Sequence, residues 1–180
     1  MIEIVLIMKK IFIPVMGMAM LCFFSSCSKE TDCCEIEPET TEETKTVTNI
    51  DNELLLKLVN DLRIAGCNCG STAMPPVKPL AWNVNLASAA IGHSEFMASA
   101  KVLQHESADG KTVGYRVSAT GYNWSNVGEN IARGQTSEEQ VFKDWLASEP
   151  HCKNMMYAVL KDMGAARSGT NWTQIFVSNL

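Results

Sequence analysis

The chain of 180 residues has the length of one domain, with 46% hydrophobic residues, 19% charged residues and a formal net charge of -5. That apolar content can form a core, which excludes a chain that is disordered throughout, and the acidic balance excludes a strongly basic nucleic-acid binder. Residues 28–49 carry seven acidic and two basic side chains, whereas residues 50–180 carry twelve and eleven. The predicted domain, 50–180, is therefore nearly neutral.

The first 26 residues are predicted to be a signal peptide of the lipoprotein type. A Lys-Lys pair precedes the mainly apolar run 11–24, which is shorter than the roughly 20 residues that cross a bilayer. Two serines then precede Cys27 in a pattern that resembles a bacterial lipobox, so Cys27 is the predicted lipidation site. A simple signal peptide cleaved near Ser26 is the alternative. Residues 1–7 read either as an upstream mis-assigned start or as native sequence.

Residues 27–49 are predicted to be the lipidated cysteine followed by an acidic tether rich in Thr and Glu. The segment has almost nothing apolar to bury, so we expect it to be disordered and extended by its charge. Such a spacer would hold the folded domain away from the membrane. The pair Cys33-Cys34 lies inside it, and either joins a partner chain or has no role.

Five cysteines follow Cys27, and export would place them in an oxidising compartment. The odd number means that at least one is free or bonded to another chain. The Cys67-Asn68-Cys69 motif is too tight for a C-x₂-C zinc clip and lacks a second pair. We predict a disulfide from Cys67 or Cys69 to Cys152, which would stabilise the fold by about 4 kcal/mol because it closes a long loop.

Apolar spacing and capping residues predict four helices, and short apolar runs bounded by Gly, Asn or Ser predict three strands. This order of elements favours an α+β layered domain with an antiparallel sheet. The expected helices are 51–65, ended by Gly66; 83–102, capped by Asn83; 113–119; and one that starts in 136–139 and is limited by Pro150. The extended connector is 74–79. The strands are 127–132, 163–167 and 172–177, the last two as a hairpin.

Three side chains are candidates for chemistry. His105 and His151 are predicted to lie in loops, where positioned residues are more often functional than in a core. Glu129 stands at the head of an apolar strand, where an unpaired carboxylate would be costly to bury, so it needs a partner. Two imidazoles and a carboxylate can bind a divalent ion or divide acid and base roles. The alternative is two scattered loop histidines and a structural glutamate.

The other distinctive residues are predicted to be structural. His93, in the middle of the second helix, is interpreted as a core histidine with satisfied hydrogen bonds. The four tryptophans are expected to pack in the core and between layers. The motifs HExxH, GxSxG, GxxxxGK[ST] and GxGxxG are absent from the sequence, which removes the common zincin, hydrolase, P-loop and dinucleotide-binding interpretations.

From about Asp51 to Leu180 the chain resembles the CAP superfamily (cysteine-rich secretory proteins, antigen 5 and pathogenesis-related 1 proteins), specifically its bacterial secreted branch. Many matches in one order carry the resemblance. They are Leu58-Val59-Asn60, Arg63, Pro79-Leu80-Ala81-Trp82-Asn83, Ala90, His93-Ser94, Met97, Leu103-Gln104-His105, Asp109-Gly110, Arg116, Gly121-Tyr122, Gly128-Glu129-Asn130-Ile131-Ala132, Trp145-Leu146-Ala147-Ser148, His151, Asn154-Met155-Met156, Met163-Gly164 and Trp172-Thr173-Gln174.

The resemblance implies a three-layer α-β-α sandwich with a central antiparallel sheet and a cleft. In the family that cleft carries two histidines and two acidic residues, which in some members bind a divalent metal such as zinc. His105, Glu129 and His151 match three of the four, and Ser148 stands where the second acid belongs. The adjacent Glu149 is a candidate substitute. The placement of the cysteines also resembles a subgroup of the branch, which supports the disulfide to Cys152.

The expected function is that of an exported, lipid-anchored module in the cell envelope, at the outer membrane or cell surface. Its cleft would bind a small-molecule, lipid or protein ligand, or a divalent metal, in an envelope or host-interaction role. The alternative is a metal-assisted hydrolase or peptidase in which His105, Glu129 and His151 are catalytic. A third interpretation is a purely structural envelope protein. A monomer is expected, and fold-level resemblance does not decide whether the protein is an enzyme.

Overall fold

The computed structural model describes residues 47–179. The predicted signal peptide, the lipidation site Cys27, the Cys33-Cys34 pair and the tether as far as residue 46 lie outside the described residues. None of the helices in the described part is long and apolar enough to cross a membrane.

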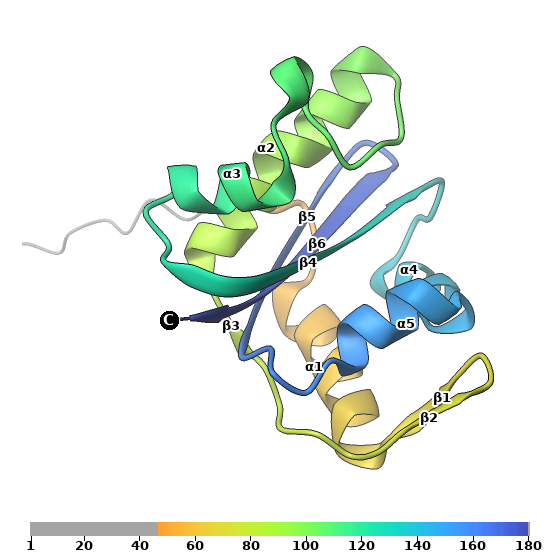
Figure 1. Ribbon diagram of the computed structural model, residues 1–180. Coiled ribbons are helices and arrows are strands. Elements are labelled where there is room, and N and C mark those ends of the chain that lie inside the picture. Colours follow the sequence, from red (N-terminus) through yellow and green to blue (C-terminus); the bar gives the residue numbers. More distant parts are fainter. Residues whose placement is uncertain (1–46, 180) are drawn as a thin grey trace, which may run out of the picture. The chain divides into compact units, whose positions relative to one another are not determined.

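Helices and strands follow one another in a mixed order (Figure 1). The helices are α1 (Asn52–Ala65), α2 (Val84–Ala100), α3 (Val113–Ala119), α4 (Glu138–Ala147) and α5 (Glu149–Met156), with a 3-10 turn at Ala108–Gly110. The strands are β1 (Cys67–Cys69), β2 (Thr72–Met74), β3 (Ala81–Trp82), β4 (Trp124–Arg133), β5 (Asp162–Ser168) and β6 (Asn171–Asn179).

The central sheet has the strand order β3-β5-β6-β4. Its three long strands are antiparallel, and β5 and β6 form the predicted hairpin. The edge strand β3 pairs in parallel with β5, so the prediction of an antiparallel sheet holds for the long strands only. We did not predict β3 because two residues are too few to show an alternating pattern. The other edge strand is β4, which carries Glu129.

Helices cover both faces of the sheet, which establishes the predicted three-layer α-β-α sandwich (Figure 1). Helices α2 and α3 lie on one face, and α1, α4 and α5 lie on the other. Successive side chains of a strand point to opposite faces. Strand β6 therefore contributes Ile175 and Val177 to the core under α2, and Trp172 and Phe176 to the core under α1.

Side-chain caps account for the helix starts, and of these Asn83 was predicted by name. Asp51 accepts a hydrogen bond from the Leu54 amide at the start of α1, and Asn83 accepts from two amides at the start of α2. Ser137 caps α4 in the same way. Gly66 ends α1 with a φ of 72°, a left-handed conformation that favours glycine.

Arg63 on α1 is fully buried and ties that helix to the connector before β3, to the end of α5 and to the segment after α5. Its guanidinium donates to the carbonyl oxygens of Lys78 at 2.8 Å and Met155 at 2.6 Å. It also donates to the carbonyls of Tyr157 at 3.2 Å and Leu160 at 3.3 Å. These four acceptors explain why a charged residue lies in the core, since an unpaired guanidinium there would be costly. Burial lowers the pKa of Arg63 to about 10.

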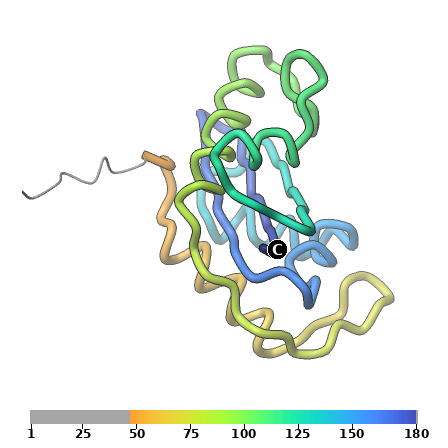
Figure 2. The backbone as a smooth tube through the Cα atoms, turned by 60° about the vertical axis from the view of Figure 1, so that its left-hand side comes forward, coloured from red at the N-terminus to blue at the C-terminus, as the bar shows by residue number. Residues whose placement is uncertain are grey.

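Two further elements were not predicted. Strands β1 and β2 form a small hairpin, which projects from the helical layer of α1 and contacts α5 (Figures 1 and 2). We interpreted Pro150 as the limit of a helix, but it occupies the first turn of α5, where its missing N–H leaves no bond unmade. His151 therefore lies on a helix rather than in the predicted loop.

The tryptophans pack between the layers, as predicted. Trp145 and Trp172 are buried, and Trp82 packs partly buried against the same core. Trp124 packs against the core under α2. The indole N–H of Trp145 donates to the Ile131 carbonyl at 3.3 Å, which links α4 to β4.

Candidate functional site

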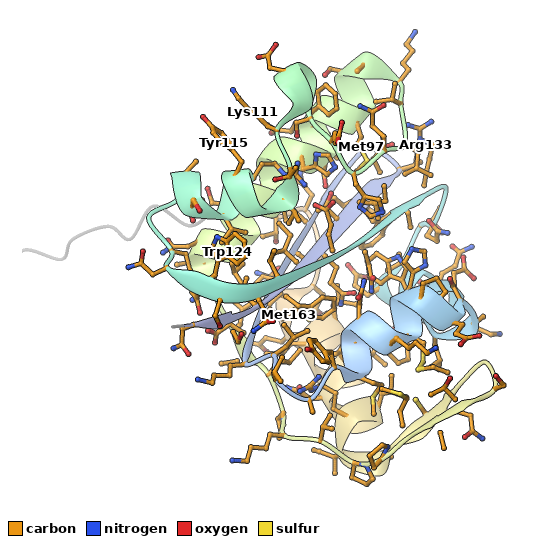
Figure 3. The ribbon with its side chains drawn as sticks, in the orientation of Figure 1. Met97, Lys111, Tyr115, Trp124, Arg133 and Met163 are labelled. Carbon is orange, nitrogen blue, oxygen red and sulfur yellow. A yellow bond between two sulfur atoms is a disulfide. The ribbon has the colours of Figure 1, made fainter. Side chains whose placement is uncertain are left out.

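The loop formed by residues 101–112, between α2 and α3, presents His105. Lys101 ends α2 in a left-handed conformation with a φ of 59°, which turns the chain away from the helix axis. Arg133, at the far end of β4, donates to the carbonyl oxygens of Lys101 and Val102 and so fixes the start of the loop (Figure 3). The loop is therefore tied to the sheet before it reaches His105.

His93 on α2 binds the same loop through both of its ring nitrogens. Its Nε2 lies 2.9 Å from the Gln104 carbonyl, which can only accept, so Nε2 carries the proton. Its Nδ1 then accepts from the Ser107 hydroxyl at 2.9 Å. Burial is the largest influence on the pKa of His93 and lowers it, which keeps the ring neutral. The prediction of a satisfied core histidine is confirmed.

Glu129 on β4 is buried and has the partners that we expected it to need. Its Oε2 accepts from the guanidinium of Arg116 on α3. Its Oε1 accepts from Nδ1 of His105 at 2.8 Å. Arg116 also donates to the carbonyls of His105 at 3.1 Å and Lys111 at 2.9 Å and to the Ser107 hydroxyl at 3.1 Å. One guanidinium therefore holds both the carboxylate and the loop.

His105 is oriented by this carboxylate and is open to solvent. Its side chain is 58% exposed, whereas that of Glu129 is only 2% exposed. Because Nδ1 is bound to the carboxylate, the neutral ring carries its proton there and leaves the Nε2 lone pair available. The hydrogen bond to Glu129 is the main cause that raises the pKa of His105.

His151 is supplied by α5, which two asparagines attach to β4. Asn130 donates to the His151 carbonyl at 3.2 Å, and Asn154 donates to the Glu129 carbonyl at 3.1 Å. Asn154 also donates to the side-chain oxygen of Asn130 at 2.9 Å. The His151 ring is half-buried, and burial lowers its pKa.

The three predicted site residues come from both sides of the edge strand β4. Glu129 lies on the side of β4 that faces α2, paired in register with Ile175 of β6. His105 contacts Glu129 from that side, whereas His151 comes from α5 on the opposite side. The two imidazoles are close enough that the charge of His105 contributes to lowering the pKa of His151.

The two histidines have opposite tendencies to bind a proton. The pKa of His105 is raised and that of His151 is lowered, so there is a pH range in which His105 is protonated and His151 is neutral. Environments that move two neighbouring pKa values apart are typical of acid and base pairs. At higher pH both rings are neutral, and each then has a ring nitrogen able to bind a metal ion.

Glu149 does not take the place of the acid that Ser148 lacks. Its carboxylate binds Lys153 at 2.5 Å and accepts from Thr72 at 3.4 Å, and so links α5 to the β1–β2 hairpin. Within residues 47–179, Glu129 is therefore the one carboxylate that is hydrogen-bonded to a candidate histidine.

Within residues 47–179, the one group of three or more potential ligand side chains with all donor atoms within 4.8 Å of one another is Cys67, Cys69 and Cys152. Cys69 and Cys152 form a disulfide, and Cys67 is free. His105, Glu129 and His151 are thus neighbours in the structure without forming a compact three-ligand cage.

The residues that hold the three candidate side chains in place were not predicted from their chemistry. Arg116, Asn130 and Asn154 are identified from the sequence only as positions that match the family, and Ser107 is not identified at all. An arginine on a short helix and asparagines near strand ends have many roles, so only their spatial contacts identify them as site residues. The helical position of His93 did indicate that it would be buried.

Comparison with known proteins gives a consistent result. The bacterial protein YkwD of Bacillus subtilis (strain 168), described as uncharacterized, is 28% identical over 142 residues, which cover 78% of this chain and 54% of YkwD. An extracellular protein containing a SCP domain from Bacillus anthracis str. Ames is similar in structure, with a TM-score of 0.65 and 27% identity over 79% of this chain and 45% of that one. The chain thus spans about half the length of each.

An outer surface protein from Borrelia burgdorferi has a TM-score of 0.62 and 16% identity over 71% of this chain and 92% of its own, which shows a shared fold. The model of the family described as "CAP: Cysteine-rich secretory protein family" matches residues 56–180, well over half of the chain. The chain belongs to the cysteine-rich secretory protein (CAP) family.

Proposed function

We propose that this CAP domain is an exported, lipid-anchored binding module of the cell envelope, and that His105 and His151 bind a divalent metal such as zinc, or a ligand in its place. The observation that carries the proposal is the hydrogen bond of 2.8 Å from Nδ1 of His105 to the buried Glu129 carboxylate. Such a bond fixes the ring and raises the basicity of the other nitrogen, as for many metal-binding histidines.

The residues fit an open site with two imidazole ligands. Both oxygens of Glu129 are occupied, by His105 and by Arg116, so Glu129 acts as the orienting carboxylate rather than as a third ligand. Neutral imidazole is a good ligand for zinc, and the lowered pKa keeps His151 neutral. Ser148 offers no carboxylate, so the remaining coordination positions are left for water or a ligand. A bound zinc ion would supply Lewis acidity to that ligand.

Export and membrane attachment rest on the sequence and on the relatives. The segment before the domain has the pattern of a lipoprotein signal, with Cys27 as the lipidated residue. The relative from Bacillus anthracis is described as extracellular, and the one from Borrelia as an outer surface protein. We place the protein at the outer membrane or cell surface, as a monomer whose ligand is a small molecule, a lipid or a protein.

The lipid anchor is tested by Cys27→Ala in cells. Without a thiol at this position no diacylglyceryl group can be attached. We expect the variant to leave the membrane fraction and appear in the soluble or secreted fraction. Retention in the membrane at the wild-type level contradicts the proposed anchor.

A hydrolase or peptidase is the second candidate, favoured by the opposite pKa shifts of the two histidines. Where both shifts apply, His105 can donate a proton and His151 can accept one on opposite sides of a bound substrate. Glu129 would hold the ring of His105 in place during this exchange. Candidate substrates are peptides, and the test is their cleavage by wild-type protein and by His151→Ala.

Calorimetric titration with zinc, magnesium and calcium, after removal of bound ions with a chelator, tests the metal site. Because free thiols also bind zinc, every variant carries Cys33→Ser, Cys34→Ser and Cys67→Ser. We expect zinc binding that is lost in the double variant His105→Ala, His151→Ala. Glu129→Gln should weaken binding by roughly 10- to 100-fold, the usual effect of losing an orienting carboxylate.

Glu149→Gln is the matched control, since Glu149 binds Lys153 and Thr72 instead of the site. It should leave zinc affinity unchanged, and far-UV circular dichroism should show that all variants are folded. Equal binding by the wild type and the double variant, or no binding by either, contradicts the metal proposal. A loss of affinity in Glu149→Gln assigns the missing acid to that residue.

A further inference from the structure

Three sulfur atoms gather where the β1–β2 hairpin meets α5. Cys67 and Cys69 alternate with Asn68 on β1 and therefore point to the same face of that strand. Cys69 is joined by a disulfide to Cys152 on α5. The free sulfur of Cys67 lies 3.8 Å from Sγ of Cys69 and 3.7 Å from Sγ of Cys152. The disulfide thus has a third cysteine in contact with both of its sulfurs.

The three cysteines differ in exposure. Cys69 and Cys152 are fully buried with Met156, whereas Cys67 is partly exposed at the margin of the same cluster. A thiol in contact with a disulfide supplies both groups that thiol–disulfide exchange requires. In that reaction a thiolate attacks one of the two bonded sulfurs. Burial of the disulfide shields it from thiols in solution, so Cys67 is the thiol best placed to react with it.

We propose that Cys67 is the nucleophile of an internal thiol–disulfide exchange that moves the disulfide from Cys69–Cys152 to Cys67–Cys152. The Cys67 thiol loses its proton, and its thiolate attacks Sγ of Cys152. The Cys67–Cys152 bond forms as the Cys69–Cys152 bond breaks, and Cys69 leaves as a thiolate that takes up a proton. One disulfide and one thiol are present before and after, so the step needs no oxidant or reductant.

Strand geometry favours attack on Cys152 over attack on Cys69. Positions two apart in a strand have Cα atoms separated by roughly 6.7 Å, at the upper limit of the range that disulfides span. A Cys67–Cys69 bond would therefore require β1 to bend out of its pairing with β2. A bond from Cys67 to Cys152 keeps the connection between two elements that already touch.

The resting arrangement keeps the exchange slow. The nearly equal distances place the Cys67 sulfur beside the disulfide rather than in line with it, whereas attack requires an in-line approach. The Cys67 side chain must therefore rotate first, which its partial exposure allows. Burial also raises the pKa of the Cys67 thiol, so the reactive thiolate is scarce near neutral pH.

The exchange would preserve the attachment of α5 while it relocates the thiol. In both isomers Cys152 remains bonded to the hairpin, so the helix that carries His151 stays tethered. The free thiol moves from the partly exposed position 67 to the fully buried position 69. It is then protected from oxidants and from alkylating agents in solution.

Disulfide mapping of the full-length protein tests the proposal, with Cys33→Ser and Cys34→Ser in every variant. After non-reducing tryptic digestion, the peptide that starts at Ile64 carries Cys67 and Cys69, and the peptide that starts at Asp144 carries Cys152. We expect Cys69→Ser to link these two peptides through Cys67 in most molecules. The matched variant Cys67→Ser should link them through Cys69. Two free thiols in a folded Cys69→Ser protein overturn the proposal.

A second measurement uses the wild-type cysteines of the domain and does not depend on the folding of Cys69→Ser. Samples incubated at mildly alkaline pH are quenched in acid, because only the thiolate exchanges, and are then unfolded, labelled with a maleimide and digested. Fragmentation of the peptide separates a label on Cys67 from one on Cys69. We expect molecules labelled on Cys69 to appear with time. A label confined to Cys67 at all times contradicts the exchange.

Discussion

Arg116 on α3 and Glu129 on β4 form an ion pair whose side chains are only 9% and 2% exposed. The same guanidinium binds the carbonyls of His105 and Lys111 and the hydroxyl of Ser107. The loop that presents His105 and the strand that presents Glu129 are therefore joined through one side chain. The geometry of the site depends on a residue that need not contact any ligand.

Replacement of this guanidinium should destabilise the fold. Arg116→Gln leaves a buried carboxylate without its strongest partner, which typically costs about 3–5 kcal/mol of unfolding free energy. Urea denaturation of wild type and variant measures the loss. Because the positive charge of Arg116 lowers the pKa of His105, the variant should also show a higher pKa for that ring in an NMR titration.

Arg116→Lys is the control that keeps the positive charge and removes the hydrogen-bonding geometry of the guanidinium. It restores a positive charge beside Glu129, but a single ammonium cannot reproduce the set of hydrogen bonds that the guanidinium makes to the loop. We expect intermediate stability and a His105 pKa close to that of the wild type. Full stability in Arg116→Gln shows that the pair has no structural importance.

Glu129→Gln should lower the pKa of His105, because the hydrogen bond from His105 to the carboxylate is the main cause that raises it. A pKa raised in the folded state means that protonation of His105 stabilises the fold. That contribution is complete below the ordinary value of 6.5 and disappears as the pH rises through the folded-state pKa. NMR titration of the His105 ring measures the change directly.

Stability measurements provide an independent check of this linkage. The loss of unfolding free energy in Glu129→Gln should be larger at about pH 5.5 than at about pH 8.5, since His105 is protonated below its ordinary pKa and loses its proton as the pH rises through its raised pKa. The loss of the Arg116 contact affects both samples. A difference between wild type and variant that is the same at both pH values shows that His105 is not coupled to Glu129.

The long elements of the fold were predictable because their signals are local. Asn83 caps α2 as expected, α4 starts within the predicted capping pattern 136–139, and β4, β5 and β6 overlap the predicted apolar runs. The errors arose where a residue has two possible meanings. Pro150 ends one helix or starts the next, and the short α4–α5 junction made the second meaning the correct one.

The supporting contacts of the site could not be derived from local patterns. The need of Glu129 for a partner followed from the cost of burying a carboxylate, and this part of the prediction is confirmed. Arg116 is the partner of Glu129 because α3 packs against β4. The spacing of residues within either element does not predict this packing. Glu149 is adjacent in sequence to the expected acid position, yet its side chain binds Lys153 and the β1–β2 hairpin.

Cys152→Ser should lower the melting temperature by several degrees under oxidising conditions. The disulfide to Cys69 closes a loop with a sequence separation of 83, and a loop of this length corresponds to about 4 kcal/mol in the chain-entropy estimate. Differential scanning calorimetry with and without a reductant measures the effect. Cys67→Ser is the control, because it retains the disulfide and should melt close to the wild type. An unchanged melting temperature in Cys152→Ser contradicts a stabilising disulfide.

Two glycines offer a test of how closely α2 packs on the sheet. Gly164 on β5 faces α2, and a Cβ there would lie 2.3 Å from the backbone nitrogen of Ala87 and 2.6 Å from the backbone carbon of Leu86. Since helix backbone cannot move aside alone, Gly164→Ala should force α2 off the sheet and cost roughly 3 kcal/mol, at the upper end for overpacking.

Gly92, within α2 itself, is the matched control for the same substitution. A Cβ there meets no heavy atom within 4 Å, and alanine favours the helix over glycine. Gly92→Ala should therefore stabilise the protein by about 0.5–1 kcal/mol. Thermal unfolding of the two variants should show shifts of opposite sign. If both variants gain stability, then α2 does not approach β5 closely, and the support that α2 gives to the His105 loop through His93 is weaker than inferred.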